Sequence, residues 1–437
     1  MKKLVILFCF RVFLFASCDK EAIKETIIES GNMGNLTWKL TNDSTLIISG
    51  KGEMMNYGYY DVNLGHLDDN DSPMPLWWEN RSSITGVVIE NGVTSIGEAI
   101  FSDCSGLKFV TIPNTVTLIN AAAFRGCSGL AEVTIPKSVT FIGWHAFAGC
   151  TGLTTVNFNA VNCTFMGDPG TSMLGSRYAF GGNSNITTVN IGSEVTIIPD
   201  HAFALLYGLT SINIPNSVTS VGSMAFYNCR DLTEVNIGNS VEIIGDMAFG
   251  GGFIGLTSIN VDAANSAFSS DNGVLFNKTK TTLVQYPIGN TGAYTIPNSV
   301  TIIGNNAFAG CRGLTEVTIG NSVEIIGELA FAGCNLTSVI IPISVMSFGR
   351  RAFACYGLTS VTIGSSVTSI GFEAFDVGDS LTEIINLATT PQTINEYTFY
   401  YIWYNTTVVT LHVPAASVDA YKTATGWKDF VNIVAIE

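Results

Sequence analysis

Residues 209–231 read LTSINIPNSVTSVGSMAFYNCRD, and this stretch recurs along most of the 437-residue chain. Close variants begin at Leu232, LTEVNIGNSVEIIGDMAFGG, and at Leu314, LTEVTIGNSVEIIGELAFAGC. One phenylalanine marks each copy, and most copies lie 22 or 23 residues apart, with two longer gaps of 33 and 59 residues. A fixed period of this length is typical of a solenoid, in which each coil buries its apolar side by stacking on the next coil.

The type repeat contains a short strand followed by a return segment. Ile212 and Ile214 point to one side of the strand, whereas Ser211 and Asn213 point to the other side. Gly222 ends the return segment, and glycine recurs in this phase in most coils, so we expect a positive φ there. The repeat therefore predicts a mainly β fold, a solenoid of ~23-residue coils with an extended parallel β-sheet and a cap at each end.

The apolar phases of the repeat predict a continuous core. The marker phenylalanines, Phe226 among them, form one ladder in which each buried ring contributes about 1.5–3 kcal/mol. Seven of the ten cysteines share another phase. We expect them to be buried free thiols, and disulfides between neighbouring coils are the open alternative. Cys163 lies outside that phase, on an insertion, so we expect it to be the more exposed thiol.

The full pattern is Leu-x-x-Val-x-Ile-Pro-x-Ser-Val-Thr-x-Ile-Gly-x-x-Ala-Phe-x-x-Cys. It resembles the BspA-like leucine-rich-repeat family of bacterial surface proteins, from about Ile84 to the C-terminus. The resemblance implies a leucine-rich-repeat solenoid and a role in cell-surface adhesion or the binding of host proteins. It carries no catalytic residues to this chain.

Departures from the repeat predict five segments. They are a lipoprotein-type signal peptide at 1–18, a tether at 19–33, an N-terminal β capping module at 34–83, the solenoid at 84–407 with insertions near 163–177 and 262–293, and a C-terminal cap at 408–437. Alternating apolar residues at 36–48 predict a hairpin in the first cap, and Asn272-Gly273 predicts another in the second insertion. We expect a helix at 414–425 that ends at Gly426.

The N-terminus has the features of an export signal. A basic start precedes an apolar run that is too short to span a bilayer. Phe15-Ala16-Ser17-Cys18 then looks like a lipobox. We therefore expect lipid on Cys18 and an outer-membrane lipoprotein at the surface of a Gram-negative bacterium, with this anchor as its membrane contact. Cleavage by an ordinary signal peptidase near Ser17 is the alternative.

Charge and motifs exclude several classes of function. A net charge of −15 without a basic stripe argues against nucleic acid. The four histidines are scattered, and no close cysteine pair, nucleophile motif or phosphate loop occurs. We therefore expect no catalytic residue, metal or cofactor, and we expect that the protein is not an enzyme. The acidic stretch 61–71 is interpreted as a solvated loop, and a cation held by Asp69 and Asp71 is the alternative.

The outward side of the strands, expected to be concave, is the candidate ligand-binding surface. One column of side chains contains Asn157, Asn190, Asn213, Asn236 and Asn260, and the column beside it contains Glu132, Glu234 and Glu316. Two interpretations stay open for these columns. They bind a partner through many small polar contacts, or they only stabilise the stacked strands through ladders of hydrogen bonds.

Two functions from different classes remain. The resemblance favours adhesion to an extracellular partner, a host matrix protein, without catalysis. The alternative is a carbohydrate-binding or glycan-handling surface lipoprotein that uses the aromatic residues gathered near the two ends. These are Tyr57, Tyr59, Tyr60, Trp77 and Trp78 near one end and Tyr397, Phe399, Tyr400, Tyr401, Trp403 and Tyr404 near the other.

The lipid anchor is directly testable. If Cys18 is lipidated, metabolic labelling with a fatty acid should mark the wild-type protein and leave Cys18→Ala unlabelled, because the thiol is the attachment point. Equal labelling of the two proteins, or of neither, contradicts the anchor.

Overall fold

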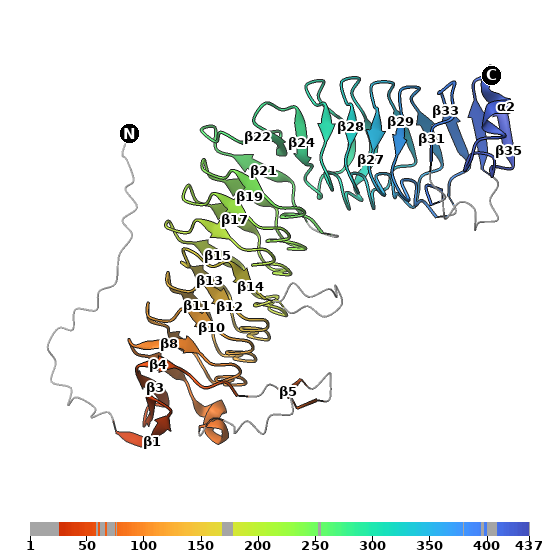
Figure 1. The fold of residues 1–437 in the computed structure, drawn as a ribbon. Helices are drawn as coiled ribbons and strands as arrows, with labels where there is room; N and C mark the ends of the chain where they lie inside the picture. Colours follow the sequence, from red (N-terminus) through yellow and green to blue (C-terminus); the bar gives the residue numbers. More distant parts are fainter. Residues whose placement is uncertain are drawn as a thin grey trace, which may run out of the picture.

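The computed structural model describes residues 26–57, 60–61, 66–67, 75, 77–167, 178–251, 255–378, 380–394, 397–399 and 409–436. Over these ranges the chain winds into an elongated solenoid of stacked coils, most of which carry two short strands (Figure 1). Strands of successive coils pair in parallel and in register, as in β11 with β13 and β13 with β15. The predicted mainly β solenoid is confirmed.

The first strands of the coils form a series whose outward side we call the first face. These strands are β7 (Gly86–Ile89), β9 (Phe109–Thr111), β11 (Glu132–Ile135), β13 (Thr155–Phe158), β15 (Thr188–Ile191), β17 (Ser211–Ile214), β19 (Glu234–Ile237), β21 (Ser258–Val261), β25 (Gly292–Thr295), β27 (Leu314–Thr318), β29 (Ser338–Ile341), β31 (Ser360–Ile363), β33 (Glu383–Asn386), β34 (Thr410–Val413) and β35 (Asn432–Ala435).

The second strands are shorter, and we call their outward side the second face. They are β4 (Gly52–Glu53), β8 (Val93–Ile96), β10 (Leu118–Ile119), β12 (Phe141–Ile142), β14 (Phe165–Met166), β16 (Ile197–Ile198), β18 (Ser220–Val221), β20 (Ile243–Ile244), β24 (Thr282–Gln285), β26 (Ile302–Ile303), β28 (Ile325–Ile326), β30 (Ser347–Phe348) and β32 (Ser369–Ile370).

A small antiparallel sheet covers the first coil. The predicted hairpin is confirmed as β2 (Leu36–Thr41) and β3 (Thr45–Gly50), and β3 then pairs in parallel with β7. Strand β1 (Ile27–Met33) pairs with β2. The tether prediction is therefore wrong over 27–33, because this stretch adds an edge strand whose backbone hydrogen-bonds to β2. The pair β5 (Tyr60–Asp61) and β6 (His66–Leu67) and the 3₁₀ helix η1 (Trp78–Ser83) complete this end.

The second insertion contains the predicted hairpin. Strands β22 (Phe268–Asp271) and β23 (Val274–Asn277) are antiparallel, and Asn272 and Gly273 turn between them with φ of 48° and 78°. β24 returns beside β23 and pairs in parallel with β26, so the insertion feeds back into the second strand series. Figure 1 shows the solenoid axis bending where β22 and β24 lie. Most of the first insertion, 168–177, lies outside the described residues.

The C-terminal cap differs from the prediction in one element. The helix expected at 414–425 is replaced by the 3₁₀ turn η2 (Ala415–Ser417) and one α-helical turn, α2 (Val418–Tyr421). Beyond the helical turn Trp427 is buried, and its indole N–H donates to the Gln392 carbonyl at 2.8 Å. Gly426 has a φ of 79°, as its expected role at the end of the helical segment requires.

A ladder of stacked rings runs through the core. Trp77 lies on Phe101 with ring centroids 6.1 Å apart, and Phe101 and Phe124 follow at 5.2 Å. The stacking continues from coil to coil, and beyond the hairpin Tyr286 takes the ladder position against Phe308 at 5.0 Å. These rings are buried, so the predicted phenylalanine ladder is confirmed as the core.

The repeated glycine has a different role from the one expected. Gly222 does not have a positive φ. A Cβ built there would lie 2.4 Å from the Asp200 nitrogen and 2.5 Å from the Pro199 carbonyl carbon, both in the preceding coil. Gly143 meets the Ala121 nitrogen at the same 2.4 Å. At Gly222 and Gly143 the glycine is therefore required by the close approach of two backbones and not by a positive φ.

Positive φ occurs two residues later, in side-chain-bearing residues. Met224 has a φ of 53°, and its N–H donates to the Asp246 carbonyl of the next coil at 2.9 Å. Intercoil hydrogen bonds of this kind offset the cost of about 1–2 kcal/mol that a left-handed L-residue carries. The residues that share this phase and conformation are Ala99, Ala122, His145, His201, Met224, Met247, Asn306, Leu329, Arg351 and Glu373.

The described cysteines are buried and unpaired, as expected for seven of them. The thiol of Cys127 donates to the Phe101 carbonyl of the preceding coil at 3.1 Å, and Cys150, Cys229, Cys334 and Cys355 repeat this contact. The expectation of an exposed Cys163 is wrong. Its side chain is buried at the start of the insertion, where burial raises the pKa of the thiol to about 12.

The role of the glycine phase can be tested with a matched pair. We expect Gly222→Ala to destabilise the fold by about 1–3 kcal/mol, because the new methyl group forces two coils apart. Gly357→Ala should change stability by less than about 0.5 kcal/mol, because its Cβ would meet only the Leu336 carbonyl oxygen, at 3.7 Å. Equal losses in denaturant melts would contradict the close-approach explanation.

Candidate binding faces and an edge groove

Side chains of the first face form straight columns because the strands pair in register. In β17, Ser211 and Asn213 are exposed while Ile212 and Ile214 are buried, and β11, β13 and β19 alternate in the same way. The register places Ser211 beside Glu234 and Asn213 beside Asn236. The two columns predicted from the sequence are therefore present on one face.

The asparagine column consists of two hydrogen-bonded ladders. Asn190 donates from its side-chain amide to Asn157 at 2.8 Å, and Asn157 donates to Thr134 at 3.2 Å. In the second ladder Asn260 donates to Asn236 at 3.0 Å, and Asn236 donates to Asn213 at 2.9 Å. The ladders thus use much of the amide hydrogen-bonding capacity to join neighbouring coils.

The glutamates of the second column differ among themselves. Glu132 accepts a hydrogen bond from Asn157, and Glu234 accepts one from Asn260 at 2.8 Å. Glu316 lies exposed on β27 and has no such contact with a described residue. The first two carboxylates therefore orient ladder amides and add negative charge to the face, whereas Glu316 adds only charge.

Threonines that precede the first strands, and others that precede the second strands, also join the coils. Thr233 donates from its hydroxyl to the Thr210 carbonyl at 3.1 Å, and Thr219 donates to the Thr196 carbonyl at 3.2 Å. The same hydroxyl contact recurs in many other coils. These contacts support the interpretation in which small polar residues stabilise the stack.

Toward the C-terminus the asparagine column changes character. Ile340 continues the column next to Thr362 and is 69% exposed. Farther along, the imidazole Nε2 of His412 lies 3.4 Å from a carboxylate oxygen of Glu383. Sequence reasoning missed these members because their residue types break the Asn and Thr pattern, although their phase would have revealed them.

The second face is more apolar than the first. Phe141 and Phe165 stack in parallel with ring centroids 4.9 Å apart, both half-buried. Ile243 is 61% exposed in the same phase of a later coil. This stripe was not predicted from the sequence.

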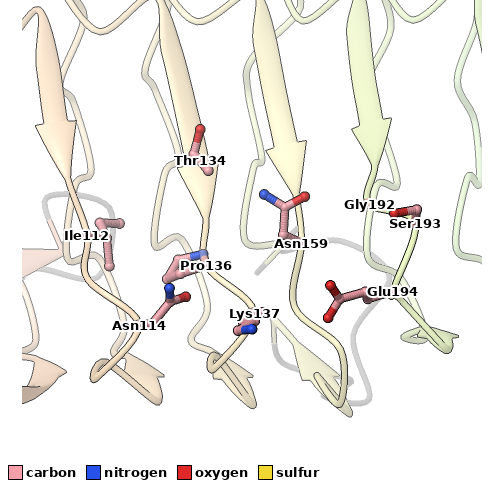
Figure 2. Close-up of a pocket in the computed structure, with 9 residues that line it drawn as sticks. All are labelled: Ile112, Asn114, Thr134, Pro136, Lys137, Asn159, Gly192, Ser193 and Glu194. Carbon is pink, nitrogen blue, oxygen red and sulfur yellow. The ribbon is translucent and has the colours of Figure 1, made fainter.

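An edge groove lies where the first strands end and the return turns begin. It has a volume of about 410 Å³ and crosses four successive coils. Figure 2 shows Thr134 on a strand, and Asn114, Lys137 and Glu194 on the turns that follow the strands. Its lining consists of Ile112, Asn114, Thr134, Pro136, Lys137, Asn159, Gly192, Ser193 and Glu194. Sequence analysis did not identify this groove.

A second, more open recess lies on the same edge in later coils. It has a volume of about 370 Å³ and includes Asn213, Asn236 and Asn260 of the second ladder. Gly238 lines this recess in the phase that Gly192 occupies in the first one. Recesses therefore form beside strand ends that lack a side chain.

Three of the terminal aromatic residues whose side chains the structure describes belong to the core. Tyr57 and Trp77 are buried at one end, and Phe399 is buried at the other end against Trp427 and Phe430. The side chains of Tyr59, Tyr60, Tyr400, Tyr401, Trp403 and Tyr404 lie outside the described residues. Tyr397 is partly exposed beside Phe372, with ring centroids 5.2 Å apart.

The described residues hold no group of three or more His, Cys, Asp or Glu side chains placed to bind a metal. The most buried charged cluster joins Arg351 to Glu373 and Asp376. Burial raises the pKa of Asp376, and the Arg351 guanidinium opposes the shift. This cluster links two adjacent coils, as a structural ion pair does. Most of the acidic stretch 61–71, with Asp69 and Asp71, lies outside the described residues.

The fold and its faces define a leucine-rich-repeat solenoid with extended polar columns. The model of the BspA type leucine rich repeat region matches six copies, over residues 77–168, 175–292 and 286–405. The chain belongs to this family. No curated protein matches the sequence significantly.

Solved structures share the fold. The pneumococcal vaccine antigen PcpA is 18% identical with a TM-score of 0.52, and the alignment covers 94% of this chain and 99% of that one. A leucine rich cell surface protein from Faecalibacterium prausnitzii is 22% identical with a TM-score of 0.48, over 92% and 97% of the two chains. A leucine-rich repeat protein from Eubacterium ventriosum is also 22% identical, with a TM-score of 0.41 over 93% and 85%.

The contribution of the asparagine ladders to the free energy of unfolding can be measured. We expect Asn236→Ala to lower the free energy of unfolding by about 1 kcal/mol, because it removes hydrogen bonds to Asn213 and Asn260. Ser211→Ala, on the same face but without a ladder contact, should stay within about 0.5 kcal/mol of the wild type. If denaturant melts give the same value for the two variants, the ladder does not stabilise the stack.

Proposed function

We propose that this protein is a cell-surface adhesion protein that binds an extracellular protein, such as a host matrix protein, through the first face. The observation that carries the proposal is the continuous exposed surface of Asn, Thr, Ser and Glu columns over successive coils. Extended solenoid faces of this kind bind partners through area and shape rather than through one deep pocket. Family membership supports a surface or binding role.

The ladders fit this role because they fix the surface before a partner arrives. Asn236 and Asn260 are held by their neighbours in the column. A side chain that is already ordered loses less conformational entropy when a partner covers it. The stabilising and binding interpretations of the columns are therefore compatible, and binding uses the remaining amide hydrogens, lone pairs and carboxylates.

The proposal includes export and anchoring through Cys18, which places the solenoid at the outer membrane of a Gram-negative bacterium. Within the described part of the chain, no helix is long and apolar enough to cross a bilayer. The lipobox-like Phe15-Ala16-Ser17-Cys18 and the basic start supply the support for a lipid anchor.

Binding through the first face can be tested by a triple substitution. Asn190→Arg, Asn213→Arg and Asn236→Arg place bulky cations on three successive coils. We expect binding to the retained member of a panel of purified extracellular-matrix proteins to weaken by more than about 100-fold, as loss of a central contact patch implies. Surface plasmon resonance with the full-length protein gives the measurement.

The second face supplies a matched control in the same coils. Ile197→Arg, Ser220→Arg and Ile243→Arg add the same charge at positions that the register aligns. We expect this variant to bind as the wild type does. If this control abolishes binding while the first-face triple spares it, the partner binds the second face. If no matrix protein binds the wild type, adhesion to the matrix is wrong.

A further inference from the structure

We propose that the edge groove is a binding site for a short neutral oligosaccharide. This proposal does not rest on the adhesive role of the first face, because it concerns other side chains and a ligand of another class. The groove volume of about 410 Å³ falls within the range of small-molecule sites. The side chains that line the groove, and the polar groups among them that the fold leaves unpaired, indicate the class of ligand.

The groove arises at the seventh residue of each coil, where the first strand ends and where most coils have proline or glycine. Pro113 and Pro136 occupy this phase in two coils, and the next two coils have Asn159 and Gly192 instead. Gly192 adds no side chain, and a Cβ there would lie 2.5 Å from the Asn159 amide oxygen. The bare strand end therefore leaves a hollow beside Asn159, and Pro136 and Ile112 line it with apolar surface.

The polar side chains of the groove are not used by the fold, except that of Thr134, which accepts a hydrogen bond from Asn157. Among the described residues, the side chains of Asn114, Lys137, Asn159, Ser193 and Glu194 have no hydrogen-bond or ion-pair partner. In another coil, an asparagine at an equivalent position does form a hydrogen bond within the fold. Asn216, in the phase of Asn114, accepts the Asn239 backbone N–H at 2.9 Å.

Asn157 and Asn159 lie in the same coil, and their side chains differ in whether the fold uses them. It lies two residues before Asn159 and is hydrogen-bonded on both sides of its ladder. The amide of Asn159 is left for a ligand, although it lies in the next exposed position of the same coil.

The backbone groups at the strand ends of the groove, in contrast, are already paired. The Asn159 N–H donates to the Ile135 carbonyl at 3.0 Å, and the Gly192 N–H donates to the Phe158 carbonyl at 2.8 Å. The Lys137 carbonyl accepts from Val161 at 3.2 Å. A peptide that adds as a strand needs free backbone donors and acceptors at these strand ends, so the side chains are the better source of recognition here.

The chemistry of these side chains matches hydroxyl groups. Two amides and two hydroxyls both donate and accept, the Lys137 ammonium donates, and the Glu194 carboxylate accepts. A sugar hydroxyl also donates and accepts at once, so it can bridge such groups. The single positive and the single negative side chain balance, which disfavours strongly charged ligands. Figure 2 shows Lys137 and Glu194 on turns on either side of the Asn159 coil, as a ligand that crosses several coils requires.

The test uses the full-length protein on an array of maltose-, cellobiose- and N-acetylglucosamine-series oligosaccharides, with acidic oligosaccharides and short charged peptides as comparison probes. We expect one neutral series to be retained. In titrations with the retained oligosaccharide, Glu194→Gln should weaken binding about tenfold, because it removes a charge-assisted hydrogen bond without changing shape. Ser193→Trp should abolish binding by filling the groove.

Asn298→Trp is the matched control, since Asn298 is exposed in the same phase of a coil outside the groove. It should bind as the wild type does. If a thermal melt shows that Ser193→Trp is not folded, the titration of the isosteric Glu194→Gln still tests the proposal. Unchanged affinity in Glu194→Gln, retention of charged probes alone, or retention of no probe overturns the proposal. Binding of Ser193→Trp to matrix protein is measured in parallel. This second measurement shows whether loss of oligosaccharide binding at the edge groove is separate from protein binding at the first face.

Discussion

The structure depends on how closely successive coils approach each other. Parallel backbone ladders fix the strands of neighbouring coils at a spacing of about 4.8 Å. At the end of most return segments this spacing leaves no room for a side chain, as Gly222 and Gly143 show against the preceding backbone. Past that point, Met224 and its equivalents adopt positive φ to donate their N–H groups to the next coil. The ring ladder then stacks at 5–6 Å because the backbone spacing imposes it.

The same spacing determines the chemistry of the surface. Residues in one phase are neighbours in space, so identical side chains form columns that must be mutually compatible. Asparagine meets this demand because its amide donates to one neighbour and accepts from the other, as Asn236 does between Asn213 and Asn260. A column of carboxylates would repel itself, and the glutamates of the adjacent column are accordingly interspersed with Thr and Ser.

Much of this architecture could be predicted from the sequence, because a period constrains every copy at once. The phenylalanine ladder, the exposed Asn columns and the Asn272-Gly273 hairpin each follow from a local rule that the repeat or the turn chemistry enforces. The roles of Gly222 and Cys163 did not follow, because they depend on the distance to another coil. The edge groove was missed for the same reason: its residues come from four coils, and no two of them form a motif.

A regular solenoid is a poor binder of small ligands, because each polar group tends to satisfy the equivalent group in the next coil. Specific sites must therefore come from departures from the repeat. Asn159 is such a departure, because proline or glycine ends this strand in most other coils, and beside it lies a hollow whose amide, ammonium and carboxylate groups have no partner among the described residues. The 262–293 insertion is a larger departure, yet its hairpin returns its strands to the stack and bends the axis (Figure 1). Small substitutions at strand ends thus create local chemistry, whereas a long insertion mainly changes the shape over which the two faces are displayed.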